Sequence, residues 1–161
     1  MPEVDYVLKD IKVVEKDTDI DFKKLYKFLG KVFSDNGYFV FEKEYMHHLK
    51  EDLRNKSIKW KGYKKVDDYS RFWIEVRIKL SNANELEGND EMLYHGDISF
   101  NFESYIQKDY YSKWEFNSLM KLLRAVWDKF FLGIKFTQYE TQLKDETYDI
   151  FNKTKTYLGG W

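Results

Sequence analysis

The three histidines are the side chains that most directly suggest chemistry, because imidazole serves proteins as a general base and as a metal ligand. His47 and His48 are adjacent, so on a strand they point to opposite faces and cannot readily bind one metal ion together. In a helix, Glu44 and His48 would be neighbours and would offer two ligands. His95 and Asp97 would share one face of a strand as an imidazole–carboxylate pair, but no nucleophile accompanies them. We therefore predict no catalytic and no metal-binding residues, and keep an enzyme built around these histidines as a third hypothesis.

Other sequence motifs of catalysis and cofactor binding are missing. The eight glycines form neither G-x-G-x-x-G nor a Walker A loop, so the common nucleotide cradles are not encoded. No serine lies in G-x-S-x-G, and H-E-x-x-H does not occur. The carboxylates of Asp67–Asp68 and of residues 85–91 lack the alternating ligands and final glutamate of a calcium loop. The sequence therefore predicts no cofactor and favours a non-enzymatic protein.

The clearest pattern in the chain is an alternation of apolar and charged residues. From Phe72 to Leu80 every even-numbered residue is apolar and, apart from Trp73, every odd-numbered residue is charged. Residues 57–66 alternate in a similar way. Because only an extended strand sends neighbouring side chains to opposite faces, the pattern predicts a sheet with one dry face and one wet face. The wet face would gather cationic and aromatic side chains: Lys59, Lys61, Tyr63, Trp73 and Arg77, with Lys65 and Lys79 beside them and Tyr105 near.

This wet face suggests binding of single-stranded nucleic acid. Aromatic rings on an open sheet can stack on bases, at about 1–3 kcal/mol for each stacked base, while cations contact phosphates. Glu75 and Glu103 interrupt the positive charge. The alternative interpretation is a solvated face with cross-strand ion pairs, or a face covered by the last helix or by a second subunit.

Aromatic residues are unusually frequent, since 5 Trp, 13 Tyr and 13 Phe make up 19% of the chain. A curved sheet that closes over a long helix can leave a cavity, which would bind an apolar or aromatic small molecule. A filled, close-packed core is the alternative. The leading hypothesis is therefore a non-enzymatic module that binds a small ligand or a protein, and nucleic-acid binding is the alternative. The expected lining of the cavity is Trp60, Phe72, Phe100, Phe102, Met120, Trp127 and Phe130.

Charge and hydropathy bound the partners and the location. The formal net charge of -1 creates no long-range attraction to nucleic acid or anionic lipid, so any such binding must be local. The acidic start lacks the layout of a signal peptide, and charged residues interrupt the most apolar stretch, 116–136. We therefore predict no membrane span and a cytoplasmic location. A homo-oligomer or a protein partner would use an exposed flank of the C-terminal helices, with the residues Trp127, Phe131, Leu132 and Trp161.

Periodicity and turn residues predict one α+β domain over residues 1–161, with an antiparallel sheet of about four to five strands and helices packed on one face. The order is strand, helix, strands, helix, helix. Facing residues of the two alternating strands should have numbers with an even sum, such as Gly62 with Phe72. Residues 42–53 could form a short helix instead of a strand. The predicted elements are 4–14 with a bulge near Lys9 and Asp10, 18–36, 37–47, 57–66, 72–80, 92–106, 112–133 and 137–160.

Two predicted helices each present an apolar face for packing. The face of the final helix consists of Tyr139, Leu143, Thr147, Ile150, Thr154 and Leu158. The face of the helix before it consists of Phe116, Leu119, Met120, Leu123, Val126, Trp127 and Phe130. Capping boxes at 112–115 and 137–140 are expected to begin these two helices, and a third at 18–21 the first helix.

The chain from Tyr38 onward resembles a group of uncharacterised archaeal proteins of similar length. The resemblance implies a single autonomous domain and carries no activity. Its matching pieces are Lys64–Tyr69 leading into Phe72–Val76, Asp109–Tyr110, Lys113–Glu115, Phe116–Phe130, Tyr139, Leu143 and Tyr157–Leu158.

Overall fold

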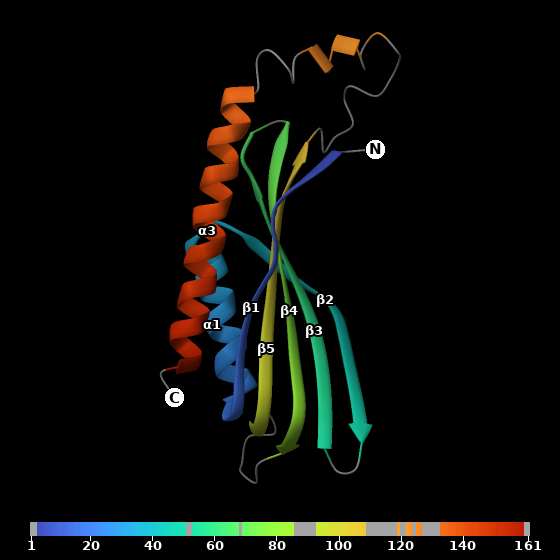
Figure 1. The fold of residues 1–161 in the computed structure, drawn as a ribbon, viewed down its shortest axis with the longest axis vertical. Coiled ribbons are helices and arrows are strands. Elements are labelled where there is room, and N and C mark those ends of the chain that lie inside the picture. The colour runs from blue at the N-terminus through green and yellow to red at the C-terminus, as the bar shows by residue number, and fades with distance from the viewer. Residues whose placement is uncertain are drawn as a thin grey trace.

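The computed structural model describes residues 3–50, 53–67, 69–85, 93–108, 119, 122–123, 125–126 and 133–159. Over these residues the chain forms a five-stranded antiparallel sheet, with strand order β1-β5-β4-β3-β2, and two long helices (Figure 1). The α+β class and the antiparallel sheet are therefore confirmed. The elements are β1 (Glu3–Asp21), α1 (Phe22–Asp35), β2 (Phe39–Lys50), β3 (Leu53–Lys65), β4 (Ser70–Glu85), β5 (Leu93–Lys108) and α3 (Gly133–Gly159).

Strand pairing determines the conformation of β1 and β2, whose sequence patterns were ambiguous. β2 stays extended to Lys50 and pairs with β3 along its whole length, so the helical alternative for residues 42–53 is wrong over the described part of that range. β1 carries the expected irregularity, with a register shift between Leu8 and Ile11 and a positive φ of 55° at Asp10. A second residue of the same φ, Asp17, marks another shift and lets β1 follow β5 as far as Asp21.

The alternation in β4 separates a dry face from a wet face, as predicted. Ile74 and Val76 are fully buried, whereas Arg77 and Lys79 are exposed. Gly62 of β3 pairs with Ile74, which has the expected even sum but lies two residues beyond the suggested partner, Phe72. We call the wet face, which carries the odd-numbered residues of β3, β4 and β5, the outer face.

α1 begins where β1 ends, and its cap differs from the predicted one. The Asp21 carboxylate accepts a hydrogen bond from the backbone amide of Lys24 at 3.2 Å, so Asp21 is the N-cap and the box at 18–21 is wrong. Residues 18–20 cannot cap the helix because β1 continues through them to Asp21. Gly37 closes the helix with a φ of 85°, as its position after Asn36 predicted.

α3 begins at Gly133, earlier than the predicted box at 137–140, and buries the predicted face: Leu143, Thr147, Ile150, Thr154 and Leu158 are buried and Tyr139 is half-buried.

Polar contacts from the sheet and from the α1–β2 turn hold α3 in place. The Glu146 carboxylate accepts hydrogen bonds from Tyr38 Oη and Lys64 Nζ, each at 2.7 Å. Tyr139 Oη donates to Asp67 in the β3–β4 turn at 2.8 Å.

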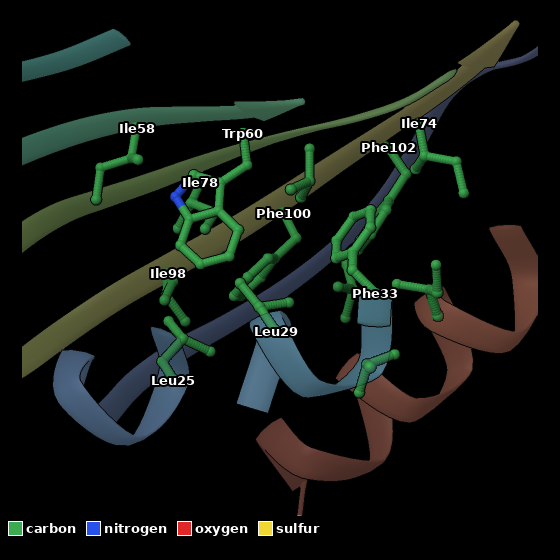
Figure 2. Close-up of a cluster of buried hydrophobic side chains, with 14 of the residues drawn as sticks. Leu25, Leu29, Phe33, Ile58, Trp60, Ile74, Ile78, Ile98, Phe100 and Phe102 are labelled. Atoms are coloured by element: carbon green, nitrogen blue, oxygen red, sulfur yellow. The ribbon is translucent and has the colours of Figure 1, made fainter. Parts of the chain in front are cut away.

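The dry face of the sheet, α1 and α3 share one hydrophobic cluster. Figure 2 shows α1 side chains pointing toward side chains from β3, β4 and β5. α3 contacts β1, β5 and α1, and Figure 1 shows it running alongside the sheet. Burial of this apolar surface contributes about 25 cal/mol per Å².

The predicted helix at 112–133 does not pack as expected where the structure describes it. Leu119, Leu123 and Val126 are helical but between 42% and 63% exposed, so their assignment to a packed face is wrong. The buried cluster against the sheet is built by α1 and α3, and none of these three residues belongs to it. The predicted cap at 112–115 and the rest of that apolar face lie outside the described residues.

The close contact between β3 and α1 gives a testable prediction. A Cβ at Gly62 would lie 2.8 Å from the Phe33 ring, so Gly62→Ala forces the ring or the strand to move. We expect a loss of about 1–3 kcal/mol in the free energy of unfolding, measured by urea denaturation. Gly30→Ala is the matched control, because nothing lies within 4 Å of that site in α1 and alanine favours helix. Equal unfolding midpoints for the two variants would contradict the prediction.

Candidate functional site

One aromatic residue from each of the five strands lies in a single cross-strand row on the outer face. Phe39 pairs with Tyr63, Tyr63 with Trp73, Trp73 with Tyr105, and Tyr105 with Tyr6. We call these five residues the aromatic row. The strand register alone produces it, since residues directly opposite one another on neighbouring strands share a face.

The rings of the aromatic row contact one another along its whole length. Neighbouring ring centroids are 5.7 Å apart for Phe39 and Tyr63, 5.3 Å for Tyr63 and Trp73, 6.1 Å for Trp73 and Tyr105, and 5.2 Å for Tyr105 and Tyr6. Phe41, one step along β2, meets Trp73 edge-on at 6.3 Å. Exposure rises toward the ends: Phe39 is 70% exposed and Tyr6 51%, whereas Tyr105 is only 8% exposed.

Two cations lie over the rings at the centre of the row. Lys61 Nζ is 5.1 Å from the ring centroid of Trp73, and the Arg71 guanidinium is 4.8 Å from that of Tyr63. Trp73 is also held in its plane, because its Nε1 donates a hydrogen bond to Gln107 Oε1 at 2.8 Å. Trp73 is therefore fixed in orientation, and the central rings lie beside positive charge.

Glu75 balances part of that charge. Its carboxylate forms ion pairs with Lys61 at 2.8 Å and Lys59 at 3.5 Å, and accepts a hydrogen bond from Tyr105 Oη at 3.1 Å. Burial works to raise the pKa of Glu75, but the hydrogen bond and charge of Lys61 outweigh it and lower the pKa. Burial and the negative charge of Glu75 raise the pKa of Tyr105 to about 12. Both groups keep one protonation state at neutral pH, so the network is a fixed part of the face.

A hollow on the outer face begins two residues along β4 and β5 from the aromatic row and is lined by Lys59, Glu75, Arg77, Asn101 and Glu103. Arg77 is exposed, and Asn101 and Glu103 are half-buried. Beyond the hollow, Lys12 and Lys79 are exposed on the same face. Positive charge is therefore concentrated locally on a chain whose formal net charge is -1.

All five residues predicted to bind nucleic acid lie together on this face, and Tyr105 is where the alternation placed it. Phe39, Phe41 and Tyr6 also lie on this face but were not predicted from the sequence. The apolar–polar alternation of β1 and β2 is weaker, and the register shifts in both strands hide which residues share the outer face.

The residues predicted to line a cavity lie elsewhere. Trp60, Phe72, Phe100 and Phe102 are between 0% and 8% exposed within the core cluster. Trp60 Nε1 is a buried donor that has no hydrogen-bond partner. A larger surface hollow lies between α1 and α3, where the rings of Phe28 and Tyr157 stack at 4.2 Å. The other predicted residues, Met120, Trp127 and Phe130, and the predicted interface residues Phe131, Leu132 and Trp161 lie outside the described part of the chain.

The histidines do not assemble a metal site among the described residues. His47 and His48 both lie on β2, opposite Lys56 and Asn55, whereas the predicted strand ended at His47.

His95 lies between two carboxylates of β1. Its Nδ1 is 2.6 Å from a carboxylate oxygen of Asp19, and its Nε2 is 2.6 Å from one of Asp17. Asp97 shares the face of β5 with His95, as predicted, but its carboxylate accepts hydrogen bonds from Asp17 and Asn82 and not from the imidazole. The bulge at Asp17 brings that residue over β5, where its backbone amide donates to Asp97 instead. Because an ionised carboxylate only accepts, the two contacts favour the imidazolium form of His95, in which both ring nitrogens donate.

Comparison of the chain with models of protein families, with curated proteins and with solved structures gave no match. The resemblance to archaeal proteins therefore stays a prediction. In the described residues, neither helix has the length and apolar character needed to cross a bilayer.

The two carboxylates beside His95 give a pH-dependent prediction. The hydrogen bonds to Asp19 and Asp17 raise the pKa of His95. Its contribution to stability is therefore complete below the unfolded value of about 6.5 and is lost as pH rises through the higher folded value. We expect the difference in unfolding free energy between the parent chain and His95→Gln to narrow from pH 6 to pH 9, in urea titrations. A difference that does not change with pH would contradict this assignment.

Proposed function

We propose that the protein is a non-enzymatic binding module that holds single-stranded nucleic acid on the outer face of its sheet. In this proposal the helices pack only on the dry face, so the outer face stays open to the ligand. A cytoplasmic location, where single-stranded RNA is present, belongs to the same proposal.

The aromatic row is the observation that carries the proposal. A sheet needs rings on its dry face to build a core, but not on its wet face, where a large exposed apolar group gains little. Here every strand contributes at least one ring to the wet face, in register, and the outermost rings of the row are the most exposed. Sequence-tolerant binding of single strands relies on such stacking platforms, because every base has a flat π-face.

In the free protein a cation covers two of the rings, and we expect a base to replace it when nucleic acid binds. A cation over an exposed ring contributes about 0.5–1 kcal/mol, whereas a stacked base contributes about 1–3 kcal/mol. A base can therefore displace Lys61 or Arg71 from the rings of Trp73 and Tyr63. The displaced cations then lie at the edge of the bases, within reach of the phosphates.

The strand spacing sets the direction of the bound strand. Neighbouring strands lie about 4.8 Å apart, so the five rings extend over about 19 Å across the sheet. Cations flank the row on both sides, with Lys65 and Arg71 along one side and Lys59, Lys61 and Arg77 along the other. A nucleic-acid strand that crosses the β-strands at right angles would place its bases on the row and its phosphates along one of these flanks.

Binding of a small apolar molecule in the core is the second candidate, favoured by the unpartnered Trp60 Nε1. A buried donor without an acceptor costs about 1–3 kcal/mol, which a ligand carbonyl could recover. We expect such a ligand to raise the melting temperature of the parent chain in a thermal-shift panel of lipids and aromatic carbonyl compounds, and to do so less in Trp60→Phe. No stabilisation by any compound would rule this candidate out.

The binding proposal is tested with fluorescein-labelled single-stranded RNA and DNA in fluorescence anisotropy. We expect Trp73→Ala to weaken binding about 5- to 150-fold, the equivalent of one lost stacked base. Phe39→Ala, at the exposed end of the row, should weaken it with less effect on folding, and Lys61→Glu should abolish most of it. Affinity should also fall steeply with salt, with a slope of about -0.7 for each phosphate contact.

Two variants on α3 serve as matched controls. Tyr148→Ala removes an exposed ring and Lys144→Glu reverses an exposed charge, both away from the outer face. They should bind as the parent chain does. Absence of binding at about 50 mM salt, or equal losses in Trp73→Ala and Tyr148→Ala, would overturn the proposal.

A further inference from the structure

Two further cross-strand rows follow the aromatic row on β3, β4 and β5. Each lies two residues, about 7 Å, beyond the row before it. A nucleotide has its groups in a similar order, with the ribose between the base and the phosphate. A base on the aromatic row can therefore leave its ribose over the second row and its phosphate toward the third. The second row consists of Lys61, Glu75 and Glu103, and the third of Lys59, Arg77 and Asn101.

The second row contains one unbalanced carboxylate. Glu75 forms ion pairs with Lys61 and Lys59. Glu103 lies opposite Glu75 and is half-buried, and within the described residues it has neither an ion pair nor a hydrogen bond. Two facing carboxylates are unfavourable, and an unbalanced carboxylate also repels phosphate. The position of Glu103 therefore favours a ligand group that donates a hydrogen bond and carries no negative charge.

The space beside Glu103 limits the size of that group. The hollow that Glu103 and Glu75 help to line has room for about one water molecule. The edge of a base is too large for this space, whereas a hydroxyl oxygen has the size of a water molecule. Within a nucleic-acid strand, the ribose 2′-OH is a hydroxyl group that can donate, and DNA lacks it.

The cations of the third row distinguish this flank from the opposite one. Arg77 is exposed and has no ion pair among the residues described, so its guanidinium is available to a phosphate beyond the ribose. On the opposite flank, Lys65 and Arg71 follow the rings directly. A ribose there would lie beside cations, and no carboxylate of these three strands occupies that row.

A bound strand would cover Glu103 and remove water from its carboxylate. In RNA the 2′-OH replaces the lost water as a hydrogen-bond donor. In DNA the 2′ carbon carries only hydrogens, so the carboxylate is covered without a donor, which is unfavourable. Glu103 therefore opposes the binding of DNA more than that of RNA.

We propose that Glu103 accepts a hydrogen bond from the ribose 2′-OH of the nucleotide stacked on Trp73, with the phosphate of that nucleotide beside Arg77. The module then binds single-stranded RNA in preference to DNA. This inference rests on the proposed function, because it requires a base stacked on the aromatic row.

The test compares labelled decamers of uridine, 2′-deoxyuridine and 2′-fluoro-2′-deoxyuridine in fluorescence anisotropy. The three carry the same base, and the 2′-fluoro strand keeps an RNA-like sugar conformation without a donor. We expect RNA to bind about tenfold more tightly than either analogue, as one hydrogen bond to a charged group provides. In Glu103→Ala the preference should fall to about twofold or less, and in Glu103→Gln, which keeps an acceptor, it should be intermediate.

DNA binding by Glu103→Ala should equal or exceed that of the parent chain, because a negative charge is lost, and this also shows that the variant is folded. Glu140→Ala, which removes an exposed carboxylate from α3, is the matched control and should keep the full preference.

Three results would overturn this inference and leave the proposed function standing: equal affinity for the three decamers, a preference for RNA that survives Glu103→Ala, or 2′-fluoro strands that bind as RNA does. Failure of every decamer to bind at about 50 mM salt would overturn both. Trp73→Ala separates the two roles, since it should weaken RNA and DNA binding alike.

Discussion

The pairing register of the five strands is the constraint on which the other features of the structure depend. Side chains alternate along a strand, so a slip of one residue would move every ring of β4 from one face to the other. The same register that brings Ile74 and Val76 into the core places Trp73 opposite Tyr63 and Tyr105. Core and outer face are therefore not independent: a change that shifts a strand damages both.

Local pattern predicted the parts of the fold in which neighbouring residues report on the same surface. The alternation in β3, β4 and β5 and the spacing of the buried face of α3 are of this kind. Prediction from local pattern failed where contacts with residues distant in sequence determine the conformation. The segment after Glu42 fits a helix and a strand equally well until β3 pairs with it, and the bulge at Asp17 places the carboxylates of Asp17 and Asp19 against His95. The same is true of the outer face. Alternation within one strand assigns Tyr63 and Trp73 to it, whereas Tyr6 and Phe39 can be assigned only once the registers of β1 and β2 are known.

The abundance of aromatic residues has two separate explanations in this structure. Rings such as Phe72, Phe100 and Phe102 fill the space between sheet and helices, and their replacement would cost packing energy. The rings of the aromatic row contact one another and two cations but face outward. This division explains why composition alone pointed to a cavity in the core, when the more exposed set of rings lies on the opposite side of the sheet.

The sheet joins the two ends of its sequence, because β1 is hydrogen-bonded to β5, and Asp17 donates to Asp97 across 80 residues. Such a long loop must close before the first strand finds its neighbour, and topologies of this kind reach the native state slowly. On the ribosome the N-terminal strand is made first but can only be incorporated last. The hairpins of β2 to β5 therefore have time to form as a platform, and β1 completes it once the fifth strand has emerged.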